Sequence, residues 1–78
     1  MRLLELDGTV LCEGGPSLNG DLIADDLVDE LCLTMAPLLV GGTSTRIAQG
    51  RAALTPRGMR LARLLQQDGY LFFRFVRA

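Results

Sequence analysis

One stretch limits the folds open to this chain more than any other: Val10-Leu11-Cys12-Glu13-Gly14-Gly15-Pro16-Ser17-Leu18-Asn19-Gly20. The apolar run Thr9–Cys12 has no alternation, which predicts a strand buried on both faces. An acid and two glycines follow it, and Pro16 stands where the first turn of a helix accepts proline. Apolar residues then recur at helix-like intervals, which predicts a helix from Pro16 to about Asp26. A strand, a glycine turn and a helix N-terminus bring unpaired backbone N–H groups together, so the stretch predicts a phosphate site.

Length and composition set the scale of the fold. The chain has 78 residues, so it holds one domain at most, yet 49% of them are hydrophobic and the mean hydropathy is +0.28. That is apolar for a small free monomer, and we expect the chain either to associate or to be a piece of something larger. No run approaches the roughly 18 apolar residues of a membrane span. The N-terminus is too short and too acidic for a signal peptide, so a cytoplasmic location is expected.

Charge is divided unevenly along the chain. Residues 1–45 carry eight acids and one base, a net charge of −7, and residues 46–78 carry seven arginines and one acid, a net charge of +6. A basic half can indicate nucleic-acid binding. Several of these arginines fall at alternate positions of a predicted hairpin, which favours a solvated face and no nucleic-acid partner. Histidine is absent, so proton transfer would use carboxylates, a cofactor or water.

The two cysteines, Cys12 and Cys32, lie in apolar strand-like runs without C-x-x-C spacing. A zinc site needs more ligands than these, so no metal site is predicted. We expect both thiols to be reduced and buried as small hydrophobic groups.

The rest of the N-terminal half predicts a βαβ unit. Residues 1–6 fit either the end of a helix or an entry strand, and Asp7-Gly8 is a turn. A second strand is expected from Leu31 until Pro37 ends its pairing. With the first strand and the helix it would form a right-handed, parallel βαβ unit. Leu38–Val40 is a further apolar run, and residues 43–57 predict a surface loop with one helical turn near Ile47.

The C-terminal segment predicts a β-hairpin. The β-prone runs 59–65 and 70–76 flank an Asp68-Gly69 turn. Alternation in the last strand places Leu71, Phe73 and Phe75 on one face, and Tyr70, Phe72, Arg74 and Val76 on the other. Both faces are largely apolar, so we expect the strand to be covered, with self-association through Tyr70–Val76 as one means of covering it.

Three groups of residues are candidates for a functional site. Glu13 lies at the carboxyl end of a predicted strand, where open α/β sheets bind ligands, and Ser17 and Asn19 add donors beside the helix N-terminus. The pattern is neither the Rossmann glycine fingerprint nor a P-loop. Asp29 and Glu30 are adjacent on a strand and would point to opposite faces, so capping and solvation are favoured over a catalytic pair. Gly41-Gly42 is expected to relieve strain at a turn, with lining of a cofactor cleft as the weaker alternative.

Three blocks in this order carry a family resemblance: residues 11–20, then Leu27-Val28-Asp29-Glu30-Leu31, then Ala36-Pro37-Leu38-Leu39-Val40-Gly41-Gly42. The chain resembles the C-terminal reductase domain of the bifunctional riboflavin-biosynthesis deaminase–reductase. The resemblance implies an α/β fold of the dihydrofolate-reductase type, of which residues 1–78 are the C-terminal portion of a single domain: a βαβ unit, further strands and the hairpin. It implies that the family's first strands lie outside this chain, which alone is then incomplete as a catalyst.

The same resemblance implies a function. It is that of an NADPH-dependent reductase which converts the ribose of 5-amino-6-(5-phosphoribosylamino)uracil to the ribityl form. Glu13 matches the family's substrate-contacting position. The positions that match its NADPH phosphate segment are Gly14, Gly15, Pro16, Ser17, Leu18, Asn19, Gly20 and Asp21. No catalytic residue is assigned.

Two further functions remain open beside the reductase. The alternative is a non-catalytic remnant that acts as an oligomerisation module, and a homo-oligomer without membrane contact is expected in either case. An arginine-rich nucleic-acid binder ranks third, because aromatic residues are not interleaved with a basic stripe in the sequence.

Overall fold

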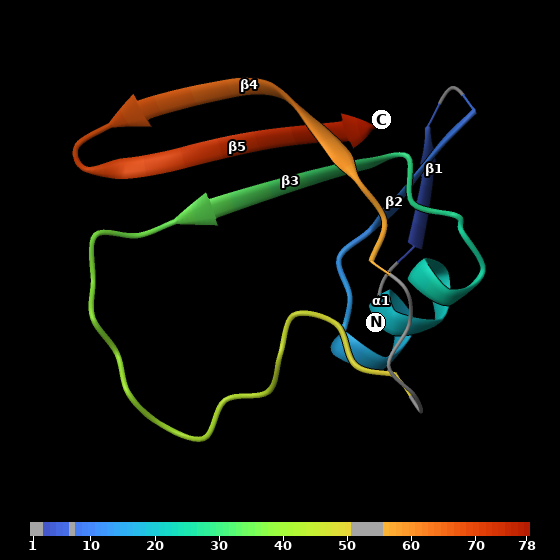
Figure 1. The fold of residues 1–78 in the computed structure, drawn as a ribbon, viewed down its shortest axis with the longest axis horizontal. Helices are drawn as coiled ribbons and strands as arrows, with labels where there is room; N and C mark the ends of the chain where they lie inside the picture. The colour runs from blue at the N-terminus through green and yellow to red at the C-terminus, as the bar shows by residue number, and fades with distance from the viewer. Residues whose placement is uncertain (1–2, 7, 51–55) are drawn as a thin grey trace. The chain divides into compact units, whose positions relative to one another are not determined.

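The computed structural model describes residues 3–6, 8–50 and 56–78 (Figure 1). Their elements, in chain order, are β1 (Leu3–Leu6), β2 (Thr9–Cys12), α1 (Pro16–Ala24), β3 (Glu30–Met35), β4 (Met59–Gln67) and β5 (Tyr70–Arg77). The chain divides into two compact units. One comprises Met1–Leu27 with Thr43–Leu54, and the other comprises Val28–Gly42 with Thr55–Ala78.

The first unit begins with a hairpin. β1 and β2 pair antiparallel, with Leu3 opposite Cys12 and Leu6 opposite Thr9, and Gly8 has a φ of +80° in the turn between them. Of the two alternatives for residues 1–6, the entry strand is therefore the one that forms at 3–6. The predicted parallel pairing of β2 with the strand after α1 is wrong. Among the described residues β2 pairs only with β1, and β3 belongs to a separate three-stranded sheet. Short glycine turns favour antiparallel pairing of the two strands that they join. The β1–β2 ladder and the β4–β5 ladder both form across such turns.

The helix α1 follows the prediction closely. Pro16 is its first residue, and it ends at Ala24 with Asp25 as the C-cap. Asp26 has a φ of +57°, and its N–H donates to the Ile23 carbonyl at 3.0 Å, while the Leu27 N–H donates to the Leu22 carbonyl at 2.9 Å. This pair of bonds is the Schellman arrangement, which ends a helix when one residue adopts a left-handed conformation.

The second unit is a sheet of three antiparallel strands in the order β3-β5-β4. Asp68 and Gly69 have φ values of +52° and +83°, as a two-residue hairpin turn requires, so the predicted hairpin is confirmed. β3 ends at Met35, two residues before Pro37, also as predicted. β5 is the central strand and is paired on both sides. Neither edge of Tyr70–Val76 is free, so this strand cannot pair edge to edge with a second copy, and self-association through its faces stays a prediction.

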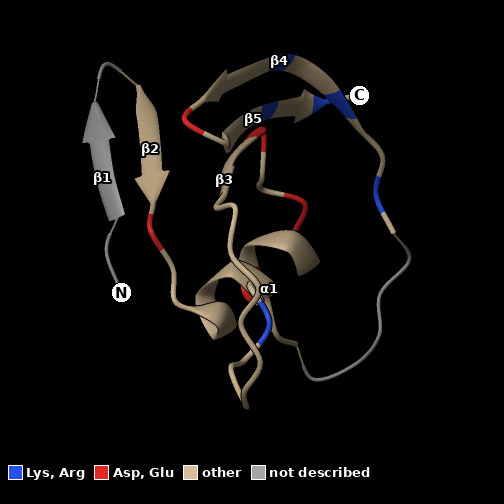
Figure 2. Ribbon diagram, turned by 90° about the vertical axis from the view of Figure 1, so that its left-hand side faces the viewer, with Lys and Arg blue, Asp and Glu red and all other residues tan. Residues whose placement is uncertain are grey.

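Cross-strand register assigns every residue of this sheet to a face, since directly opposed residues point the same way. The apolar face holds Leu31, Leu33 and Met35 from β3, Met59, Leu61 and Leu64 from β4, and Leu71, Phe73 and Phe75 from β5, with Gln66 and Arg77 as its polar members at the two ends. The mixed face holds Glu30, Cys32 and Thr34, then Arg60, Arg63, Leu65 and Gln67, then Tyr70, Phe72, Arg74 and Val76. Figure 2 shows the arginines spread along β4 and β5.

No hydrophobic side chain is buried among the described residues. Val10 and Leu11 are 59% and 45% exposed, so the prediction that β2 is buried on both faces is wrong; β2 has a single neighbouring strand. Cys12 is half-buried, but Cys32 is exposed, because it lies on the mixed face of an outer strand. Leu38–Val40 is exposed and forms no strand.

The segment after Gly42 is a loop over 43–50 and 56–58, as predicted. It contains bends at Ile47 and Ala48 in place of the helical turn that was expected there. Residues 51–55 of the predicted loop lie outside the described residues.

Candidate functional site

The predicted phosphate site is a single local structure, the glycine turn, which we define as residues 13–18. It leads from the end of β2 into the first turn of α1. Gly14 has a φ of +85°, a left-handed conformation that favours glycine, and the Gly14–Gly15 peptide is cis. Gly15 is the N-cap, with a φ of −77° and no side-chain cap. The turn therefore presents only main chain and the exposed Ser17 side chain at the start of the helix.

Backbone donors at this end are set by helix geometry. The first intrahelical bond runs from the Asn19 N–H to the Gly15 carbonyl at 3.0 Å. The N–H groups of Ser17 and Leu18 precede that bond and have no acceptor within the helix, and Pro16 has no N–H. The first turn contains no acidic residue. Two amide donors and the positive end of the helix dipole therefore coincide, which favours an anion electrostatically.

Asn19 serves a different purpose from the one its sequence position predicts. Its Nδ2 donates to the Ile47 carbonyl at 2.9 Å, and its Oδ1 accepts from the Cys12 Sγ at 3.5 Å. Both ends of the amide are thus engaged by the protein itself. Asn19 connects the end of β2, the helix and the segment around Ile47, and it fixes the position of the turn between them.

Gly20 makes the approach of that same segment possible. A Cβ built on Gly20 would lie 1.7 Å from the Gln49 carbonyl oxygen, so no side chain fits there. The Gln49 N–H donates to the Pro16 carbonyl at 2.9 Å. Residues 47–49 therefore pack directly on the first two turns of α1, and Gly20 is one of the two buried residues of the described chain, with Gly14.

The predicted site residues accordingly fall into two groups. Gly15, Ser17 and Leu18 surround the unpaired N–H groups, and a Cβ on Gly15 would have no neighbour within 4 Å. Asn19 and Gly20 are turned toward residues 47–49 instead. Glu13 is exposed at the start of the turn, and Asp21 is exposed one helical turn beyond the donors.

The contribution of Ile47 and Gln49 to the site was not predicted from the sequence. Their contacts are made by main-chain atoms, which any residue type supplies, and the segment has no periodicity. Gly20, a glycine inside a predicted helix, was the one available signal, because such a glycine indicates close approach of another backbone.

Asp29 and Glu30 are both exposed, as the prediction of solvation requires, and each also forms a surface ion pair. Glu30 Oε1 accepts from Arg74 Nε at 2.6 Å, and Asp29 Oδ1 accepts from Arg77 Nε at 3.2 Å. The hydrogen bond from Arg74 lowers the pKa of Glu30 below its usual value, assisted by a weaker bond from Cys32. Desolvation raises the pKa of Cys32, and the neighbouring Glu30 raises it further. These pairs join the start of β3 to the end of β5.

Two searches for other kinds of site found nothing within the part of the chain that the structure describes. No group of three His, Cys, Asp or Glu side chains is placed to hold a metal ion there. The described residues include no helix with the length and hydropathy to cross a membrane. Gly42 has a φ of +151° and Gly41 has open space around it, which fits a turn.

The family model described as the RibD C-terminal domain matches residues 3–70, which include β1, β2, the glycine turn, α1, β3 and β4. No curated protein matches the chain.

Proposed function

The chain belongs to the RibD C-terminal domain family, a family of NAD(P)H-dependent reductases, and from this premise we propose that it forms the cofactor-binding part of such a reductase. The proposed cofactor is NADPH, and the proposed substrate is 5-amino-6-(5-phosphoribosylamino)uracil, whose ribose is reduced to the ribityl form. Residues 1–78 would be the C-terminal part of a single reductase domain. The observation that carries the proposal is the glycine turn, in the position where the family pattern has its phosphate segment.

The chemistry of the turn fits a pyrophosphate. Phosphate oxygens accept hydrogen bonds from the N–H groups of Ser17 and Leu18, and the missing side chain of Gly15 leaves room for them to approach the backbone. Asn19 and Gly20 would position the turn, since their contacts are with residues 47–49. Asp21 lies one turn away and is exposed, so its carboxylate need not face the phosphates.

NADPH supplies the hydride, and this chain's own residues would bind and orient the reactants. Glu13 projects from the carboxyl end of β2 next to the turn, which is where a substrate hydroxyl would meet a carboxylate. Since the chain has no histidine, a proton for the reduced sugar would come from a carboxylic acid or from water.

NADPH binding by the intact chain tests the proposal, with nicotinamide fluorescence as the readout. Gly15→Val places a side chain in the open space beside the donors, so NADPH should bind at least about tenfold more weakly, equivalent to about 1.4 kcal/mol. Gly41→Val is the matched control, because a Cβ there also meets nothing within 4 Å. Equal dissociation constants for the two variants would remove the glycine turn from the cofactor site.

One observation favours the second candidate, an oligomerisation module. The apolar face of the sheet bears Leu31, Leu61 and Leu64 at 37%, 46% and 48% exposure, and no core is buried among the described residues. Light scattering across a concentration series distinguishes the two. A stable oligomer that does not bind NADPH would favour the module over the reductase.

A further inference from the structure

The mixed face of the three-stranded sheet brings together positive charge and exposed aromatic rings. Arg63 lies directly opposite Arg74, and the next pair along the same face is Leu65 and Phe72. Arg60 lies on this face too, opposite Val76. The face therefore holds three arginines and one acid, Glu30, which is paired with Arg74. Arg60 and Arg63 have no ion pair among the described residues.

A β-bulge produces this grouping. Arg60 and Arg63 are three positions apart, and in a regular strand they would point to opposite faces. The register shifts between Leu61 and Arg63, so Ala62 is an extra residue and both arginines lie on the mixed face. Bulges often re-aim side chains beside functional sites. The same shift keeps Leu61 and Leu64 on the apolar face.

Aromatic rings lie next to the arginines. Tyr70 and Phe72 are each 40% exposed, and their rings are stacked with centroids 6.4 Å apart and an interplanar angle of 22°. Phe72 is two residues from Arg74 along β5, a separation of roughly 6.8 Å. A ring that stacks on Phe72 would hold an attached phosphate within reach of the arginines.

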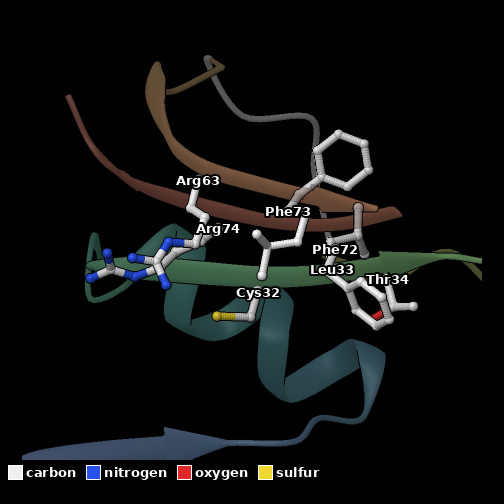
Figure 3. A pocket seen from close by; sticks show the side chains of 8 residues that line it. Cys32, Leu33, Thr34, Arg63, Phe72, Phe73 and Arg74 are labelled. Carbon is white, nitrogen blue, oxygen red and sulfur yellow. The ribbon is translucent and has the colours of Figure 1, made fainter. Parts of the chain in front are cut away.

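A hollow of about 210 Å³ joins these features. Figure 3 shows the side chains that line it. It is lined by Cys32, Leu33, Thr34, Arg63, Leu65, Phe72, Phe73 and Arg74. Arg63 and Arg74 run alongside each other at one end of this view, with Phe72 toward the other end beside Thr34. The hollow is thus polar and cationic at one end and aromatic at the other.

We propose that the mixed face of sheet β3-β5-β4 binds a free mononucleotide, with its phosphate at Arg63, beside the Arg74–Glu30 pair, and its base stacked on Phe72. Arginine suits this ligand because its guanidinium forms paired hydrogen bonds with phosphate oxygens. Aromatic side chains suit it because any nucleobase has a face on which they stack. The hollow offers one arginine pair beside one aromatic ring, which suits a single nucleotide. A long single strand uses a series of such stacking contacts, which the hollow does not provide.

This site is separate from the glycine turn, which belongs to the other unit. The proposal therefore does not depend on the reductase function.

The test uses the intact chain with three probes: 5′-AMP, adenosine and inorganic phosphate. Binding is followed by ¹H–¹⁵N NMR, in which 5′-AMP should shift the amides of β4 and β5 around Arg63 and Phe72. Adenosine and inorganic phosphate should each bind at least about fivefold more weakly, because each lacks one of the two contacts. Adenosine binding as tightly as 5′-AMP would overturn the role of the arginines.

Variants then separate the contacts. Arg63→Gln should weaken 5′-AMP about tenfold, Arg63→Lys should weaken it less because the charge remains, and Phe72→Leu should weaken it at least about fivefold. Arg46→Gln is the matched loss of a positive charge outside the sheet, and it should leave 5′-AMP binding unchanged. The cross-strand pattern of NMR contacts establishes that each variant retains the sheet.

Three results would overturn the proposal. The first is an Arg63→Gln variant that retains the sheet and binds 5′-AMP as tightly as Arg46→Gln does. The second is a set of 5′-AMP shifts confined to residues 13–18, or no shifts at millimolar 5′-AMP. The third is decauridylate binding that is more than about tenfold tighter than 5′-AMP and falls steeply with salt, which would identify single-stranded nucleic acid as the occupant.

Discussion

The glycine turn and the three-stranded sheet differ in what fixes their geometry. The turn is fixed mainly by main chain: a left-handed Gly14, a Gly20 that admits the Gln49 carbonyl, and the bond from the Gln49 N–H to Pro16. One side chain, Asn19, adds a bond to the Ile47 carbonyl. The sheet is fixed by register, by ring stacking and by ion pairs between side chains. Addition of a single methyl group should therefore disrupt the turn, whereas the sheet should respond in proportion to the side-chain contacts removed.

The largest effect is expected from Gly20→Ala. Alanine normally stabilises a helix interior by about 1 kcal/mol over glycine. Here the new Cβ would lie 1.7 Å from the Gln49 carbonyl oxygen, so the segment has to move, and we expect a loss of about 2 kcal/mol or more in the free energy of unfolding. Urea denaturation measures it. Gly15→Ala is the control, since its Cβ meets nothing, and equal losses in the two variants would show that residues 47–49 do not pack on the helix.

The two faces of the sheet should respond unequally to loss of an aromatic ring. Phe73 is half-buried on the apolar face, between Leu33 and Leu64, and its ring stacks on Phe75 with centroids 5.9 Å apart. Phe72 is 40% exposed on the mixed face. Buried Phe→Ala changes cost about 3–5 kcal/mol, and partial exposure reduces this, so we expect about 1–2 kcal/mol for Phe73→Ala and less for Phe72→Ala. A larger loss for Phe72→Ala, measured by the same denaturation, would reverse the assignment of the faces.

A change at Asn19 tests whether this side chain holds the segment 47–49 in place without setting the stability of the whole fold. Asn19→Asp retains the oxygen that accepts from Cys12 but loses the Nδ2 donor to the Ile47 carbonyl, and it should cost about 0.5–1.5 kcal/mol. The loss should be local, with faster hydrogen exchange at the Gln49 amide, which donates to Pro16, and no change at the β3–β5 ladder. Unchanged exchange at Gln49 would mean that the amide does not hold the segment.

Local features of the fold could be predicted from the sequence, and long-range strand pairing could not, for a physical reason. The hairpin, the helix start at Pro16 and the end of β3 depend on residues with strong local preferences, and each was predicted to within two residues. The partner of β2 and the second partner of β5 are long-range choices that alternation does not encode: the first was predicted wrongly, and the pairing of β3 with β5 was not predicted at all. The bulge at Ala62 has no signature in the pattern, so the common face of Arg60 and Arg63 could only come from the register.

The smallest effect concerns the ion pair between Glu30 and Arg74, and it appears as a pH dependence. The Arg74 hydrogen bond lowers the pKa of Glu30 in the folded state below the ordinary value of 4.5. A lowered folded-state pKa means that the unfolded chain binds the proton more readily. The pair therefore stabilises the fold above pH 4.5, and this contribution disappears as the pH falls through the lowered pKa of Glu30. Both side chains are nearly half exposed, at 43% and 49%, so solvent screens the pair and the slope should be shallow.

An NMR titration of the Glu30 side chain in the intact chain and in Arg74→Gln measures this directly. Loss of the guanidinium should return the pKa of Glu30 toward 4.5, and thermal unfolding of Arg74→Gln should depend less on pH below that value. Arg77→Gln is the matched variant, because it removes a guanidinium from the neighbouring pair with Asp29 and should leave the titration of Glu30 as it was. If both variants change the pKa of Glu30 equally, the effect comes from net charge rather than from the Glu30–Arg74 hydrogen bond. The start of β3 would then be held to β5 by the backbone ladder alone.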